Sequence, residues 1–182
     1  MNLPNVVTIA RILLVPVLVW AIAAGEMRLA FILFVAAGVS DAVDGFVAKR
    51  FGMTTEIGAH LDPLADKMLI IAIFVGLGWF GKIPLWLVIL VVSRDILIIG
   101  GVMFAMLLGR PITVRPLWIS KVNTVAQIVF ASVVLAALGF DFDAEPAQSI
   151  IMYLVAILTL LSIGFYTREW VRHMNATEGE SG

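Results

Sequence analysis

Residues 149–166 read SIIMYLVAILTLLSIGFY, a run of eighteen residues without a charged side chain. A run of this length and composition can cross the hydrocarbon core of a bilayer as a helix. The apolar residues are continuous rather than alternating, which disfavours a transmembrane barrel. The pattern predicts an all-α integral membrane protein with six transmembrane helices. The five other apolar stretches lie at about 12–24, 29–40, 68–81, 84–109 and 122–139.

The composition agrees with a membrane protein. The chain has 182 residues, of which 62% are hydrophobic and 14% charged, and its mean hydropathy is +1.06. Soluble globular domains are about half apolar and a quarter charged, so a soluble enzyme and a disordered chain are both excluded. The net charge of −1 excludes a nucleic-acid binder driven by bulk positive charge. Because cysteine is absent, disulfides and thiolate metal sites are excluded as well.

The two ends of the chain are expected to differ from the spans. The opening MNLPNVVTIAR, residues 1–11, is predicted to form a short N-terminal interfacial helix, because Val7 and Ile9 suit the headgroup region. Residues 175–182 are polar and contain glycine, which predicts a flexible tail. We expect the remainder, residues 1–174, to be a single membrane domain.

Basic residues gather on one side of the predicted spans. If the N-terminus is cytoplasmic, Arg28 and Lys82 are the basic residues left in the outside loops, and the last outside loop is acidic. This positive-inside pattern places both termini in the cytoplasm, and residues 41–66 at the cytoplasmic ends of the second and third spans. The basic residues assigned to the cytoplasmic side are Arg11, Lys49, Arg50, Arg110, Arg115, Arg168 and Arg172.

Four aspartates lie in the segment between the second and third apolar stretches, SDAVDGFVAKRFGMTTEIGAHLDPLADK, residues 40–67. Asp41 and Asp44 are three residues apart, so they share one face of a helix. Asp62 and Asp66 are four residues apart and share a face as well. The 17 residues between the two pairs contain no long apolar run, which suits a reversal between antiparallel helices. The two faces can then point at each other and place four carboxylates in one cleft.

Four carboxylates beside a bilayer require a counter-charge. An aspartate in the middle of a membrane helix costs about 2.5–3.5 kcal/mol on insertion scales, and less near the interface. Oxygen ligands without histidine or cysteine select Mg²⁺, Mn²⁺ or Ca²⁺ rather than zinc. Two divalent cations would balance the four charges and would suit phosphoryl transfer. Helix capping, or pairing with Lys49, Arg50 or Lys67, explains one aspartate at a time but not all four together.

Small residues stand at fixed spacing among the aspartates, at Gly45, Ala48 and Gly58. With them the segment resembles the signature of the CDP-alcohol phosphatidyltransferase family, D-x2-D-G-x2-A-R-x8-G-x3-D-x3-D. The one departure is Lys49, which stands where the family has arginine and is followed by Arg50. Lysine keeps the charge but lacks a bidentate grip on phosphate. Either Lys49 makes a point contact, or Arg50 fills that position.

The resemblance implies an integral membrane phosphatidyltransferase of phospholipid biosynthesis. Two Mg²⁺ or Mn²⁺ ions, held by the four aspartates, would grip the diphosphate of CDP-diacylglycerol, and CMP would leave after attack by an alcohol. By position, Asp66 is the general base. The family also implies a homodimer in a bacterial cytoplasmic membrane with the active site facing the cytoplasm. The residues implied to bind the CDP group are Asp41, Asp44, Gly45, Ala48, Lys49, Gly58 and Asp62, although the three small residues equally suit tight helix packing.

Two later stretches bear on the acceptor alcohol. SRDILIIGG, residues 93–101, and PLWISKVNTVAQ, residues 116–127, are more similar to the cardiolipin-forming branch of the family. They favour phosphatidylglycerol as the acceptor, and the alternative is glycerol 3-phosphate. A basic pocket for the acceptor's phosphate is predicted from Arg94, Arg115 and Lys121.

Each of these assignments has an alternative. Arg94 equally suits an ion pair with Asp95 or with an aspartate of the cluster, and Arg115 equally suits contact with lipid headgroups. On the predicted fifth span, Asn123 and Gln127 either bind acceptor hydroxyls or link helices, and linking is favoured.

A divalent-cation transporter is the alternative from a different class, because acidic residues in membrane helices often line ion paths. A transporter would carry its carboxylates near the midplane, with access from both sides. Here the aspartates lie at one end of the predicted spans, and the outer halves of the spans carry almost no polar groups. This distribution favours the enzyme.

Overall fold

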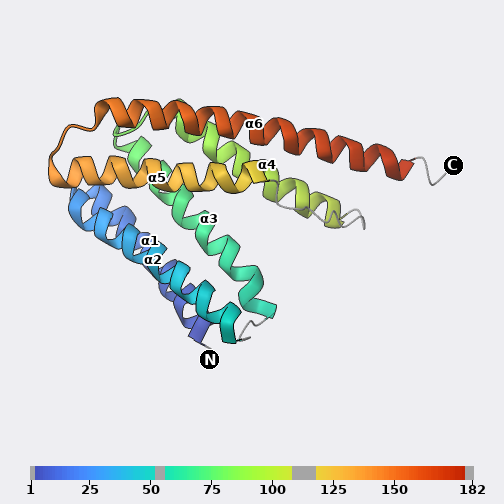
Figure 1. The fold of residues 1–182 in the computed structure, drawn as a ribbon, viewed down its shortest axis with the longest axis horizontal. Helices are drawn as coiled ribbons and strands as arrows, with labels where there is room; N and C mark the ends of the chain where they lie inside the picture. The colour runs from blue at the N-terminus through green and yellow to red at the C-terminus, as the bar shows by residue number, and fades with distance from the viewer. Residues whose placement is uncertain (1–2, 52–55, 108–117, 179–182) are drawn as a thin grey trace.

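The part of the chain that the structure describes folds into six α-helices (Figure 1). The computed structural model describes the backbone of residues 3–51, 56–107 and 118–178, and the side chains of residues 10–40, 67–101 and 118–171. The predicted all-α class is confirmed. The helices are α1 (Leu3–Ala23), α2 (Met27–Phe51), α3 (Glu56–Trp79), α4 (Leu85–Leu107), α5 (Trp118–Phe140) and α6 (Glu145–Glu178).

The N-terminal segment is continuous with the first apolar stretch. Because α1 runs unbroken from Leu3 to Ala23, the prediction of a separate interfacial helix over residues 1–11 is wrong. Pro4 lies in the first turn, where a missing N–H is tolerated. Pro16 lies inside α1 without ending it. The predicted tail over residues 175–182 stays a prediction, since α6 ends at Glu178 and the last four residues lie outside the described chain.

Helices α2 and α3 extend well beyond their apolar stretches. α2 continues past Ser40 to Phe51, and α3 begins at Glu56 rather than near Asp62. The connection between them is therefore residues 52–55, much shorter than the reversal expected from the sequence. Hydropathy marks the part of a helix that lipid or core surrounds. Polar residues can extend the helix further, because its backbone hydrogen bonds do not require apolar side chains.

Three helices end in the same way at one end of the bundle. Gly25 after α1, Gly81 after α3 and Asp141 after α5 have positive φ angles of 78°, 67° and 53°. In each case the next N–H donates to a carbonyl five residues earlier, which is the Schellman motif. Figure 1 shows these three connections gathered opposite the C-terminal ends of α2, α4 and α6. Successive helices therefore alternate in direction along the chain.

The outer surface is strongly apolar. Trp79, Trp118 and Ile150 are 83%, 82% and 70% exposed. Exposed apolar patches of this kind mark lipid or protein contact rather than contact with water. By length and composition, the described parts of two helices can cross a membrane, Trp118–Phe140 and Glu145–Val171. Shorter apolar helical segments occur at Ala10–Ala23, Met27–Ser40 and Lys67–Trp79.

The apolar core lies where α3 meets α1 and α5. Ile73, Phe74 and Leu77 of α3 have no exposed surface, and the ring centroid of Phe74 lies 6.0 Å from that of Phe130 on α5. α1 packs on α2 and α3, α5 packs on α2 and α6, and α4 packs on α3 and α6. The N-terminal half of the chain is thereby joined to the C-terminal half chiefly where α2 packs on α5 and α3 packs on α4.

Gly139 lets the end of α5 approach the start of α2 closely. A Cβ atom at this position would lie 2.8 Å from both the Cα and the N of Arg28. Arg28 Nε donates a hydrogen bond to the carbonyl oxygen of Gly139 at 3.2 Å, and its guanidinium lies 5.2 Å from the ring centroid of Phe140. The glycine therefore permits a backbone contact that a larger residue would prevent.

Gly139→Ala is expected to destabilise the fold by about 1–3 kcal/mol, because backbone rather than a flexible side-chain tip must move. Thermal unfolding in detergent micelles measures the effect. Gly164→Ala on α6 is the matched control, since a Cβ there meets nothing within 4 Å. Equal unfolding temperatures for the two variants would show that the contact between Arg28 and Gly139 is not constraining.

Candidate active site

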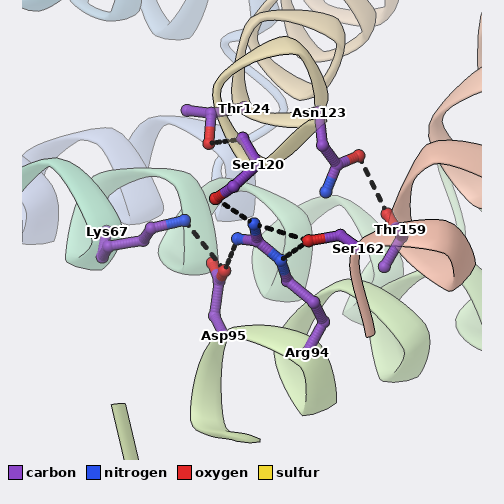
Figure 2. Close-up of polar contacts among 8 residues, drawn as sticks. All are labelled: Lys67, Arg94, Asp95, Ser120, Asn123, Thr124, Thr159 and Ser162. Carbon is purple, nitrogen blue, oxygen red and sulfur yellow. Dashed lines mark hydrogen bonds and ion pairs between the residues drawn. The ribbon is translucent and has the colours of Figure 1, made fainter. Parts of the chain in front are cut away.

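Buried charges on α4 connect it to α3. Arg94 and Asp95 are 0% and 1% exposed. Asp95 Oδ1 accepts a hydrogen bond from Lys67 Nζ of α3 at 2.8 Å, and another from Arg94 Nη1 at 2.5 Å (Figure 2). Ionisable groups inside a membrane protein are expensive unless they pair with one another. The Lys67–Asp95–Arg94 arrangement supplies that pairing within one small region.

Arg94 also links α4 to α5 and α6. Its Nε and Nη2 donate to Ser162 Oγ of α6 at 3.1 and 3.0 Å, and Nη2 donates to Ser120 Oγ of α5 at 2.5 Å. Figure 2 shows the guanidinium lying among Asp95 and the two serines. The planar fork of arginine can bond several partners at once, which a lysine cannot do in this geometry. A single side chain therefore connects three helices.

A second polar link lies beside the first, between α5 and α6. Thr159 Oγ1 donates to Asn123 Oδ1 at 3.1 Å, and both residues have no exposed surface. The helix-linking role predicted for Asn123 is confirmed. Gln127, one turn further along α5, is equally buried, and neither of its amide atoms has a hydrogen-bond partner among the described residues.

Two cavities flank the buried polar residues. One, of about 370 Å³, lies between α4 and α6 and includes Arg94 in its wall. The other, of about 330 Å³, is lined by Phe34 and Gly38 of α2 and Ile128 of α5, with Arg11 of α1 also in its wall. Along α2, this second cavity directly precedes the aspartate segment.

The four aspartates all fall within helices. Asp41 and Asp44 lie in the C-terminal part of α2, and Asp62 and Asp66 in the N-terminal part of α3. These helices run in opposite directions, joined through residues 52–55 (Figure 1). Lys67, which follows Asp66, begins the buried ion network. The predicted site residues whose side chains lie outside the described set are Asp41, Asp44, Gly45, Ala48, Lys49, Gly58, Asp62 and Asp66.

Comparison with known proteins decides the family. A family model described as CDP-alcohol phosphatidyltransferase matches residues 1–161, which include the aspartate segment and the ion pairs among Lys67, Asp95 and Arg94. The chain belongs to the CDP-alcohol phosphatidyltransferase family. The resemblance carried by the aspartate motif is therefore confirmed at the level of the family.

Relatives of this family member carry two different names. The human cardiolipin synthase (CMP-forming) is 32% identical over 181 residues, which cover 91% of this chain and 60% of the relative. The chloroplastic CDP-diacylglycerol–glycerol-3-phosphate 3-phosphatidyltransferase 1 of Oryza sativa subsp. japonica is 36% identical over 182 residues, which cover 89% of this chain and 55% of the relative. The CDP-diacylglycerol–glycerol-3-phosphate 3-phosphatidyltransferase of Bacillus subtilis (strain 168) is 31% identical over 186 residues, which cover 93% of this chain and 95% of the relative. The chain thus spans little more than half of the first two and nearly all of the third.

The pocket predicted for the acceptor is described in part. Arg94 is buried, and of its two predicted roles the ion pair with Asp95 is confirmed. Lys121 is exposed on α5, and within the described side chains no hydrogen bond or ion pair involves it. Arg115 lies outside the described residues. A pocket formed jointly by Arg94, Arg115 and Lys121 therefore stays a prediction.

Sequence reasoning missed the hydroxyl partners of Arg94. Ser120 and Ser162 lie in apolar helices, where serine occurs often and its spacing carries no signal of a distant partner. The burial of Asp95 in an ion pair did have a signal, because a carboxylate in an apolar stretch needs a cationic partner. The described part of the chain therefore holds structural polar residues that the aspartate motif does not reveal.

Proposed function

We propose that this phosphatidyltransferase transfers the phosphatidyl group of CDP-diacylglycerol to a hydroxyl of phosphatidylglycerol, giving cardiolipin and CMP. The observation that carries the proposal is the aspartate motif, which lies at family spacing on α2 and α3 within the matched residues 1–161. The sequences at 93–101 and 116–127 support phosphatidylglycerol as the acceptor.

Divalent cations suit the donor set of this motif. Four carboxylates without histidine or cysteine are the ligands preferred by Mg²⁺ or Mn²⁺. In this proposal two such ions are held by Asp41, Asp44, Asp62 and Asp66. When bound, the ions neutralise the diphosphate of the donor and lower the pKa of a nearby hydroxyl.

Side chains of the protein then accept the proton and bind the substrates. The oxygen of the acceptor's hydroxyl bonds to the phosphorus that bears diacylglycerol, and Asp66 accepts the proton of that hydroxyl. The bond from that phosphorus to the bridging oxygen breaks, and CMP leaves with the electron pair. Gly45, Ala48 and Gly58 leave space for the nucleotide, and Lys49 or Arg50 contacts its phosphate. The cavity between α2 and α5 is where we place the donor's acyl chains, since it directly precedes Asp41.

The proposal includes an arrangement in the membrane. All six helices cross a bacterial cytoplasmic membrane, with both termini and the aspartates on the cytoplasmic side. Residues 1–174 act as one domain, followed by the tail, and two copies form a homodimer. The apolar outer surface and the alternating helix directions support this arrangement.

A second acceptor is supported by a separate observation. The Bacillus subtilis relative, whose name specifies glycerol 3-phosphate, matches over 95% of its own length. With that acceptor the same chemistry would yield phosphatidylglycerophosphate and CMP. The motif, the cations and Asp66 would keep their roles.

Reconstituted protein with CDP-diacylglycerol and Mg²⁺ is expected to release CMP when phosphatidylglycerol is added. Parallel reactions with glycerol 3-phosphate test the second acceptor, and reactions with EDTA in place of Mg²⁺ are expected to release none. CMP release with glycerol 3-phosphate alone would refute cardiolipin formation and retain the family chemistry. Release with neither alcohol would refute both acceptors.

A further inference from the structure

The cavity between α4 and α6 has properties that the ion network does not explain. Its volume of about 370 Å³ falls in the range of ligand pockets, roughly 300–1,000 Å³. Most of its wall is apolar, including Leu97, Ile98 and Ile163. Leu97 is 56% exposed on the outer surface, so the cavity opens toward the surrounding lipid. An apolar chain can therefore enter sideways without crossing water.

Two hydrogen-bond donors in this cavity lack acceptors. Tyr166 and Trp170 lie one helical turn apart on α6, and both line the cavity. The Tyr166 hydroxyl and the Trp170 indole nitrogen are buried and have no hydrogen-bond partner in the described part of the chain. Aromatic anchors at the end of a membrane span normally keep these atoms among water and headgroups. Because an indole N–H can only donate, the missing partner is an acceptor, such as an oxygen atom.

Two glycines of α4 also line the cavity, beside these donors. A Cβ atom at Gly100 would meet nothing within 4 Å. At Gly101 it would lie 3.8 Å from Trp170 Cδ1 and 3.9 Å from Trp170 Nε1, so the polar edge of the indole faces α4 across this glycine. Gly100 therefore leaves free volume in the cavity, whereas Gly101 lets the Trp170 indole lie against α4.

The cavity lies close to the aspartate motif. Arg94 belongs both to its wall and to the ion network, which continues through Asp95 to Lys67, the residue after Asp66. The residues that line the cavity lie within 94–101 of α4 and 163–170 of α6. A ligand here would have its polar end toward the network and its apolar end toward the bilayer.

We propose that this cavity binds the acceptor phospholipid, with ester or phosphate oxygens accepting hydrogen bonds from Tyr166 and Trp170 and an acyl chain lying against Leu97 and Ile163. The inference rests on the proposed use of phosphatidylglycerol and specifies where that lipid sits. Both unpartnered donors and the adjacent guanidinium complement oxygen-rich, anionic chemistry. The acceptor's free headgroup hydroxyl then extends toward α3 and the aspartate motif.

Filling the cavity is the first test. Gly100→Leu is expected to raise the KM for phosphatidylglycerol at least about tenfold, with little change in kcat or in the KM for CDP-diacylglycerol, because it removes binding and not chemistry. Gly164→Leu is the matched control, since it adds the same side chain where a Cβ also meets nothing within 4 Å and lies outside the cavity. Equal KM values for the two variants would overturn the inference.

Removing the donors is the second test. Tyr166→Phe and Trp170→Phe are each expected to raise the same KM about 2- to 10-fold, the value of one hydrogen bond. Tyr153→Phe, on the exposed surface of α6, is expected to leave it unchanged. Unchanged values for both cavity variants would contradict the assigned contacts.

Photolabelling gives a readout that needs no turnover. Phosphatidylglycerol carrying a diazirine on one acyl chain is added to wild-type protein in EDTA, and labelled peptides are identified by mass spectrometry. Labelling within 97–101 or 163–170 that Gly100→Leu abolishes and Gly164→Leu retains would support the site. Stronger labelling there by CDP-diacylglycerol, equal competition by phosphatidylcholine, or a change of oligomeric state in Gly100→Leu would overturn it.

The inference and the proposed function fail in different ways. Wild-type protein that releases CMP only with glycerol 3-phosphate would refute the lipid acceptor itself, and the acceptor site with it. Wild-type protein that uses phosphatidylglycerol, together with a normal KM in Gly100→Leu, would refute only the location of the acceptor.

Discussion

Asp66→Asn is expected to lower CMP release from CDP-diacylglycerol by about 10²–10⁴-fold, the usual contribution of a general base. Asparagine is close in size to aspartate, but it cannot accept the acceptor's proton and brings no charge to a bound cation. The measurement is CMP release by reconstituted protein at saturating Mg²⁺ with phosphatidylglycerol. Thermal unfolding in detergent is expected to show that the variant is folded.

Asp141→Asn is the matched control for this substitution. Asp141 is exposed after α5 and has a φ of 53°, a conformation that asparagine adopts readily. Its activity is expected to equal that of the wild type. Comparable activity of Asp66→Asn and Asp141→Asn would remove Asp66 from the mechanism and favour a purely structural bundle.

The same pair of variants separates an enzyme from a divalent-cation transporter. Sealed vesicles containing the wild-type protein are expected to show no tracer Mn²⁺ uptake above empty vesicles in the absence of CDP-diacylglycerol. Uptake by wild-type and Asp141→Asn protein that Asp66→Asn abolishes would overturn the enzymatic assignment of the motif.

Apolar runs predicted where the later helices lie, but not where they end. The stretch at 84–109 corresponds to α4 at Leu85–Leu107, whereas the stretch at 149–166 lies inside a much longer α6, Glu145–Glu178. The start of α6 is set by a local contact, because Asp143 Oδ1 accepts a hydrogen bond from the backbone N–H of Glu145. Helix ends depend on such caps, and an apolar run does not report them.

The aspartate motif was accessible from sequence because its chemistry is local. Two pairs of carboxylates at helical spacing define faces before any tertiary structure is known. The geometry of the four side chains stays a prediction, as they lie outside the described residues. The family match over residues 1–161 supports the motif independently of that geometry.

The buried network depends on contacts that sequence spacing cannot supply. Arg94 and Asp95 are adjacent, and adjacent residues of a helix do not face each other, yet the long arginine side chain reaches back to Asp95. Ser120 and Ser162 are 26 and 68 residues from Arg94. Only the packing of α4 between α3 and α6, with α5 alongside, brings these partners together.

Arg94→Met is expected to destabilise the protein by about 3–5 kcal/mol, because it removes one partner of a buried ion pair. Methionine keeps much of the length but leaves Lys67 as the remaining cation paired with Asp95 among the described residues. Asp95 Oδ2 already has no hydrogen-bond partner there. The midpoint of thermal unfolding in detergent measures the loss, at about 2–4 °C per kcal/mol for a chain of this size.

The double variant Arg94→Met with Asp95→Leu is expected to be more stable than Arg94→Met alone. Replacing both members of a buried pair by apolar residues removes the uncompensated charge and is often neutral or stabilising. Lys67 loses its partner at 95, but its side chain is 25% exposed and can reach polar surroundings. Asp95→Leu alone completes the comparison. If the stability loss of the double variant equals the sum of the losses of the two single variants, the two residues are not energetically coupled.

Stability and acceptor use are expected to separate in that double variant. If Arg94 serves the acceptor's phosphate as well as the fold, restoring stability without restoring the guanidinium leaves the KM for phosphatidylglycerol high. Arg94→Lys retains a charge for Asp95 but cannot bond Asp95, Ser120 and Ser162 together, so it is expected to be intermediate in both properties. A double variant that regains wild-type KM would confine Arg94 to a structural role, and the acceptor's phosphate would then have to be bound by other basic residues, with Arg115 and Lys121 the first to test.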